Sequence, residues 1–273
     1  MGRAVDDRGI VATAVNPFAD AAAMRHSNYC RHDGTRLVNA STGESASALS
    51  AFVHDGVLSL ALNPQFSCLG ARSALRRRAY RFGLYPALGC PRSAAGLARD
   101  LFTFVQETPA FDGELSTYIA SFEGPVVADE PSFEDHLWST LQYLHDADAL
   151  HHAWDGTVSD DPDDPHFSFS FAGTALFVVG LHAASSRVAR RFAWPTLAFN
   201  PHRQFEKLKS EGLFERFQTT IRSAERALQG DVNPMLSEFG DRSEAAQYSG
   251  RKVEENWRCP FHARGDAGPG ETQ

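Results

Sequence analysis

The sequence lacks the signatures of several large enzyme classes. It has no P-loop, no G-x-G-x-x-G after a strand pattern, no H-E-x-x-H and no G-x-S-x-G. These motifs respectively cradle phosphates, bind dinucleotides, hold zinc and present a serine nucleophile. Their absence argues against a nucleotide-binding protein and against a hydrolase of these common types.

Cysteine is also scarce, with four residues in a chain of 273. Cys30, Cys68, Cys90 and Cys259 lie far apart, and none belongs to a C-x-x-C pair. A chain of this length does not need disulfides in order to fold. We therefore expect four free thiols, each of which is either a packing residue or a ligand.

Long apolar runs and a basic charge balance are absent as well. No apolar stretch approaches the length of a membrane span, and the first residues do not read as a secretory signal. The net charge of −8 argues against non-specific nucleic-acid binding, which depends on neutralising phosphates. We expect a cytoplasmic protein that binds neither membranes nor nucleic acid.

The chain does have enough hydrophobic residues to form one large core. Hydrophobic residues make up 42% of the sequence, and it holds 20 Phe against 6 Tyr. No linker divides it, so we predict an N-terminal arm (1–45) that is loosely packed, one catalytic domain (46–262) and a disordered tail (263–273). Phenylalanine in this quantity also suits an apolar cavity.

The stretch 166–206 carries the clearest strand signals. Polar and aromatic residues alternate over 167–171, an unbroken apolar run covers 175–181, and a third strand is predicted over 196–199. Helical spacing is seen over 93–106, 133–145, 203–211 and 213–228. We predict the α+β class, as a single domain with a mainly antiparallel sheet flanked by helices.

Cys68 lies where a glycine-containing loop leads into an Ala/Leu/Arg segment that favours helix. Backbone amides at a helix N-terminus lower the pKa of a thiol, so we expect Cys68 to be biased towards thiolate. Over Cys68 to Ala71, the sequence resembles the ligand loop of cytochrome haem-thiolate monooxygenases. The alternative is an ordinary buried cysteine.

Several other residues are candidate ligands. His182 ends the second strand of the stretch and either binds a metal or caps the sheet edge through Ser185 or Ser186. His202 precedes a helix and is equally explained as part of its first turn. Cys259 ranks lower, since Pro260 removes one amide that would support a thiolate.

Two arginine clusters, 72–81 and 187–191, stand out in an acidic chain. Arginines of this kind pair with haem propionates or with a substrate carboxylate, or they form a solvated helix face. The acidic loop that includes Asp160 and Asp161 either faces a cationic substrate or is a plain turn.

The pattern as a whole resembles the YqcI/YcgG family over most of residues 48–262. The segments that carry the resemblance are 66–75 (FSCLGARSAL), 80–85 (YRFGLY), 144–146 (LHD), 154–155 (WD), 159–165 (SDDPDDP), 166–206, 233–234 (NP), 247–251 (QYSGR) and 257–261 (WRCPF). The resemblance implies a haem-dependent N-hydroxylase acting on L-arginine. The implied product is Nω-hydroxy-L-arginine, as in D-cycloserine biosynthesis.

This chemistry implies haem b, whose iron is held by Cys68 or, as second choice, by His182, with dioxygen or peroxide as oxidant. The sequence shows no flavin or nicotinamide motif, so electrons are expected from an external reductase. The candidate residues that would contact the haem are Arg72, Arg76, Arg81, Ser186, Arg187 and His202. For the guanidinium of the substrate the candidates are Asp160, Asp161, Glu238 and Glu244, and for its carboxylate Arg187 and Arg251.

Two other functions compete with this interpretation. One is a haem-binding sensor or carrier without turnover. The other is a zinc hydrolase built on His145, His151 and Asp146, which lie close together in the sequence.

Overall fold

The computed structural model of the protein describes residues 15–111 and 115–263. The strands are β1 (Cys30–His32), β2 (Leu37–Asn39), β3 (Tyr80–Ala87), β4 (Thr117–Gly124), β5 (Phe169–Phe171), β6 (Thr174–Leu181) and β7 (Thr196–Pro201). The α-helices are α1 (Ala21–His26), α2 (Ala48–Ala61), α3 (Leu69–Arg77), α4 (Pro91–Glu107), α5 (Glu130–Asp148), α6 (Arg203–Ser210), α7 (Phe214–Gln229) and α8 (Ala245–Tyr248). Two short 3₁₀ helices are η1 (Thr108–Phe111) and η2 (Val188–Arg190).

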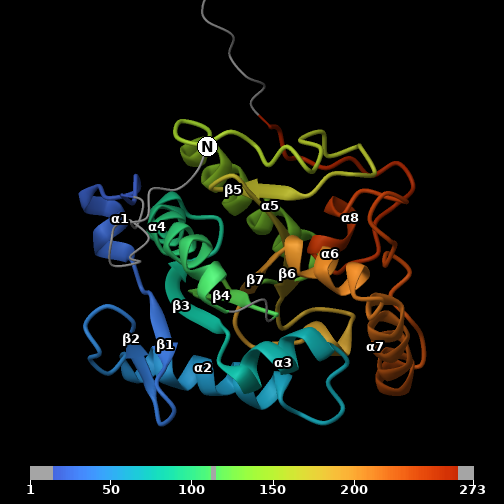
Figure 1. Ribbon diagram of the computed structural model, residues 1–273, viewed down its shortest axis with the longest axis horizontal. Helices are drawn as coiled ribbons and strands as arrows, with labels where there is room; N and C mark the ends of the chain where they lie inside the picture. Colours follow the sequence, from blue (N-terminus) through green and yellow to red (C-terminus); the bar gives the residue numbers. More distant parts are fainter. Residues whose placement is uncertain (1–14, 112–114, 264–273) are drawn as a thin grey trace, which may run out of the picture.

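The strands form one sheet in the order β2-β1-β3-β4-β7-β6-β5, with helices on both faces (Figure 1). Only the pair β3 and β4 is parallel among the described strands, and every other neighbouring pair is antiparallel. The predicted class, α+β with a mainly antiparallel sheet flanked by helices, is confirmed.

Each face of the sheet has its own hydrophobic core. Helices α4 and α5 cover one face, where side chains such as Leu97, Phe104 and Leu141 pack against Tyr118 and Phe199 of the central strands. Helices α2 and α3 cover the other face with a smaller cluster. Because successive side chains in a strand point to opposite faces, each central strand contributes to both cores.

The stretch 166–206 folds as the sequence predicted, into three consecutive strands. Phe169 of β5 pairs with Leu176 of β6, and β6 then pairs along its length with β7. Ala172 and Gly173 form the tight turn between β5 and β6 with positive φ angles of 52° and 66°. This is the backbone twist that two-residue hairpins favour.

The N-terminal segment differs from the expected loosely packed arm where the structure describes it. Strands β1 and β2 lie at one edge of the sheet, and the buried residues of this region include Tyr29, Cys30, Leu37 and Val38. Each of the two strands has three residues, which is too short for a period-2 pattern to be recognised. Residues 1–14 of the arm and 264–273 of the predicted tail lie outside the described residues.

The helices are those of a globular core. The longest, α5, has 19 residues and mixes buried apolar side chains with charged ones. Across the described parts of the chain, no helix has both the length and the apolar character that crossing a membrane requires.

Candidate functional site

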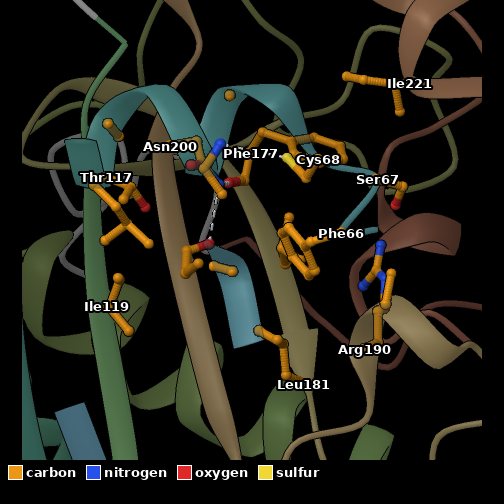
Figure 2. A pocket seen from close by; sticks show the side chains of 18 of the residues that line it. Phe66, Ser67, Cys68, Thr117, Ile119, Phe177, Leu181, Arg190, Asn200 and Ile221 are labelled. Atoms are coloured by element: carbon orange, nitrogen blue, oxygen red, sulfur yellow. Dashed lines mark hydrogen bonds between the residues drawn. The ribbon is translucent and has the colours of Figure 1, made fainter. Parts of the chain in front are cut away.

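A cavity of about 280 Å³ lies on the face of the sheet that α2 and α3 cover. Its walls are mostly apolar and come from α2, α3, the central strands and the segment around η2. Figure 2 shows lining side chains from several of these elements. The strands contribute Thr117, Ile119, Phe177, Val179, Leu181, Ala198 and Asn200.

Cys68 lies in this cavity at the N-cap of α3, as the sequence predicted (Figure 2). Its backbone is extended, with φ −80° and ψ 101°, and its sulfur accepts a hydrogen bond from the N–H of Ala71 at 3.5 Å. The helix that follows is rich in Ala, Leu and Arg, and it ends at Arg78 in the left-handed conformation. The helix therefore presents its amide end and one thiol to an apolar space.

The amides at the helix N-terminus lower the pKa of Cys68 as expected, but the predicted bias of this thiol towards thiolate is wrong. Burial raises the pKa of this thiol, and the amides of Ala71 and Gly70 and the charge of Arg190 offset that effect only in part. A thiolate in an apolar cavity loses its hydration, which costs more free energy than two amides return. A cation bound at the sulfur is what would hold Cys68 as thiolate.

Arg190 brings a half-buried positive charge to the same cavity (Figure 2). Its guanidinium donates hydrogen bonds to three backbone carbonyls, those of Gly180 at 3.2 Å, Tyr248 at 2.9 Å and Gln247 at 3.1 Å. No carboxylate among the described residues forms an ion pair with it, and burial lowers the pKa of Arg190 to about 10. A half-buried cation without a carboxylate partner favours an anion in the cavity.

Arg187, which the sequence proposed as a contact for haem or substrate, also lines the cavity. Its charge is already compensated, since it pairs with Glu225 at 2.7 Å and Asp231 at 2.6 Å. Of these two neighbouring arginines, Arg190 therefore has the greater capacity to attract an anion.

His182 lies on the opposite face of the sheet from Cys68. Its ring is fully buried and stacks on Phe133 of α5, with 4.2 Å between ring centroids. Neither ring nitrogen has a hydrogen-bond partner among the described residues, and burial lowers the pKa of His182 to about 4. The strand alternation explains this placement, because Leu181 points into the cavity and the next residue points away.

Two other predicted residues come together in a second, neighbouring cavity of about 170 Å³. His202 and Glu244 both line it, and the distance between His202 Nε2 and Glu244 Oε1 is 3.4 Å. Glu238 is exposed and lines it as well. The sequence gave no reason to expect contact between His202 and Glu244, because they lie about forty positions apart. Sites in folded proteins often combine residues from such distant segments.

The other arginines proposed from the sequence, and Ser186, line neither cavity. Arg72 donates to the carbonyl of Pro64 at 3.4 Å, and Arg76 is exposed on α3. Arg81 pairs with Glu107 at 2.7 Å, and Ser186 donates hydrogen bonds to the carboxylate of Glu130 from its hydroxyl at 2.7 Å and its N–H at 2.8 Å. The side chain of Arg251 is held by Glu134 at 2.7 Å and by Glu254 at 3.1 Å.

Asp160, Asp161 and Cys259 are also distant from both sets of lining residues. The two aspartates are exposed in a loop, and Asp161 accepts a hydrogen bond from the N–H of Asp163 at 3.0 Å. Cys259 packs with aromatic residues in the larger core, and burial raises its pKa to about 12.

The described residues do not contain the cluster of metal ligands that a zinc hydrolase would need. Within residues 15–111 and 115–263, no three His, Cys, Asp or Glu side chains are grouped so as to hold a metal ion. His145 packs against Trp154 and Phe261, and His151 against Phe18, so both serve as packing rings.

The sequence analysis missed a set of polar side chains that faces the Cys68 cavity. The amide of Asn200 donates to the carbonyls of Phe177 and Ala198, and Gln204 accepts from the N–H of Ser116 at 2.8 Å. Thr117 is a third member of the set. The alternating residues of the strand segments 117–122 and 196–200 were the available signal for these polar side chains. Such alternation does not tell which face of the sheet borders a cavity.

Comparison with known proteins places the chain in a family. The family model described as YqcI/YcgG family matches residues 54–262, which is more than half of the 273 residues. Searches of curated proteins and of solved structures find no match. By its sequence, therefore, the chain is a member of the YqcI/YcgG family.

Proposed function

We propose that this protein is a haem-dependent N-hydroxylase that converts L-arginine to Nω-hydroxy-L-arginine, the type of step found in D-cycloserine biosynthesis. The observation that carries the proposal is the position of Cys68, one thiol at a helix N-cap in a large apolar cavity. Membership of the YqcI/YcgG family supports it, because this family resemblance implies haem chemistry on a guanidine.

The residues present fit haem b. A planar, apolar macrocycle needs apolar walls, a single strong ligand to iron and cations for its two carboxylates. The cavity provides mostly apolar walls, the sulfur of Cys68 and the half-buried guanidinium of Arg190, which has no carboxylate partner among the described residues. We assign Cys68 as the iron ligand and Arg190 as the main anion partner.

When bound, haem would supply the activation of dioxygen or peroxide that guanidine N-hydroxylation requires. The overall reaction inserts one oxygen atom into a guanidine N–H bond. With dioxygen, the second oxygen atom leaves as water and consumes two electrons and two protons. With hydrogen peroxide, it leaves as water without added electrons.

The protein's own residues would stabilise charge and exclude solvent. The amide of Ala71 and the guanidinium of Arg190 offset the negative charge of a Cys68 thiolate. Apolar side chains such as Phe177 and Leu181 keep the surroundings dry, which strengthens these electrostatic interactions. With dioxygen as oxidant, electrons come from a separate reductase in the cytoplasm, since the sequence carries no flavin or nicotinamide motif.

The test is a turnover assay with the purified, haem-loaded protein. It is given L-arginine, a reductase system and ¹⁸O₂, or hydrogen peroxide in a parallel sample, and the product is analysed by mass spectrometry. We expect Nω-hydroxy-L-arginine carrying one ¹⁸O atom in the first sample. Haem binding without hydroxyarginine in either sample would favour a haem-binding sensor or carrier instead.

A further inference from the structure

The second cavity shares a wall with the Cys68 cavity. Both are lined by the same apolar side chains, Phe177, Phe205, Phe217, Ile221 and Leu236. Beyond this wall the second cavity has more charged lining residues, Glu206, Lys209, Arg222, Glu238 and Glu244, whereas the Cys68 cavity has Arg187, Arg190 and Glu225. The mostly apolar Cys68 cavity therefore adjoins a cavity with more charged residues in its lining.

Glu244 is the buried charge of the second cavity, with 5% of its surface exposed. Its carboxylate has two side-chain contacts, both long, at 3.4 Å from His202 Nε2 and 3.4 Å from the hydroxyl of Tyr248. The same hydroxyl accepts a hydrogen bond from the N–H of Phe169 at 2.9 Å. A buried carboxylate held this weakly leaves most of its acceptor capacity for a cation in the cavity.

The aromatic rings beside Lys209 interact with its own ammonium group. The ammonium of Lys209 lies 5.4 Å from the ring centre of Phe214 and 5.8 Å from that of Phe239, within the range of cation–π attraction. It also pairs with Glu206 at 2.9 Å. The ring of His202 lies 4.5 Å from Phe239, so the aromatic surface continues inward towards Glu244.

We propose that this second cavity binds an amino acid with a cationic side chain. Its guanidinium or ammonium group pairs with the carboxylate of Glu244, and its α-carboxylate is attracted by Lys209 and Arg222. The rings of Phe205 and Phe239 flank the aliphatic part. The residues of the cavity indicate a ligand with a positively charged side chain. The identification of that ligand as L-arginine, bound next to the Cys68 cavity, rests on the proposed function.

The test compares two ligands of nearly equal shape. Isothermal titration calorimetry is done on the full chain with its bound cofactor and without a reductant or peroxide, so that no turnover occurs. We expect L-arginine to bind and L-citrulline, whose urea group is uncharged, to bind at least about tenfold more weakly. Equal binding of the two ligands, or no binding of L-arginine, would overturn the inference.

Variants locate the site. Glu244→Gln keeps the shape of the side chain and should weaken L-arginine binding at least about tenfold, whereas the exposed Glu215→Gln on α7 should leave it unchanged. If Glu244→Gln does not fold, Phe239→Leu tests the same cavity from its wall. Unchanged binding in the folded variant refutes the assignment.

The binding assay and the turnover assay test the two proposals independently of each other. Binding that depends on Glu244 without any hydroxyarginine would refute the proposed function and leave this site in place. Hydroxyarginine formation with the same KM for arginine in wild type and Glu244→Gln would support the proposed function and refute the site.

Discussion

The sulfur of Cys68 accepts a hydrogen bond from the N–H of Ala71, 3.5 Å away in the first turn of α3. This half-buried thiol therefore has a backbone donor beside it and also lines the cavity, and it is the iron ligand that we propose. The first prediction concerns the consequence of removing this sulfur.

Cys68→Ser should abolish thiolate ligation. In the wild type we expect the ferrous carbon monoxide complex to show the strongly red-shifted Soret band of haem-thiolate proteins, and in the variant its loss. His182→Gln is the matched control, since His182 lies on the other face of the sheet and should leave the band unchanged. A wild-type band typical of imidazole ligation would contradict the assignment of Cys68.

Gly250→Ala should destabilise the fold through Arg190. Gly250 has φ 87°, and an added Cβ would lie 2.5 Å from Cδ of Arg190, which would force the guanidinium away from its three carbonyls. We expect a loss of about 3 kcal/mol in the free energy of unfolding, measured with urea. Gly212→Ala, at φ 67° with no atom within 4 Å, should cost about 1 kcal/mol from backbone strain alone. Equal losses in the two variants would contradict the role of Arg190.

His182→Phe should reduce the acid sensitivity of the fold. Burial lowers the pKa of His182 to about 4, below its ordinary value of 6.5, so the folded state binds its proton less readily than the unfolded state. The stability linked to this group is complete above about pH 6.5 and is lost as the pH falls towards 4, by about 3 kcal/mol in total. Urea unfolding at several pH values should show a shallower decline in the variant. A parallel decline in both proteins would disprove this prediction.

Tyr85→Phe should cost more stability at pH 8 than at pH 5. The hydroxyl of Tyr85 donates to the buried carboxylate of Asp100 at 2.7 Å, and burial raises the pKa of Asp100 to about 6. Since this pKa lies above the unfolded value, the contribution of Asp100 to stability is greatest below about pH 4 and is lost as the pH rises through 6.

Removing the donor therefore harms mainly the ionised form of Asp100. We expect a loss of about 2 kcal/mol at pH 8 and clearly less at pH 5, measured by urea unfolding. The exposed Tyr143→Phe is the control and should have little effect at either pH. A loss that is the same at both pH values would mean that Asp100 does not titrate between them and would contradict its raised pKa.

Local sequence patterns predicted much of the fold. The alternation over 167–171 and the apolar run that follows gave β5 and β6, and the glycine-containing loop before an Ala/Leu/Arg segment placed Cys68 at a helix start. These features depend on neighbours within a few residues, so they are visible without knowing the rest of the chain. Short edge strands such as β1 and β2 lack that local signal.

The site could be predicted only in part, because it depends on contacts between distant segments. Arg190 is held by carbonyls of Gln247 and Tyr248, more than fifty positions away, and nothing in its local sequence distinguishes it from Arg187. Likewise, the pKa of Cys68 depends on the depth of its burial, which is a property of the whole fold.

The division of the sheet into two unequal faces affects how the family can diversify. On the face of α4 and α5, Phe and Tyr side chains fill the space, while on the face of α2 and α3 a cavity takes part of it. Substitutions in α2, α3 or α7 can reshape the cavity while the larger core keeps the fold stable, because distant sites contribute independently to stability. Such substitutions can therefore change what the cavity binds while the scaffold around it is kept.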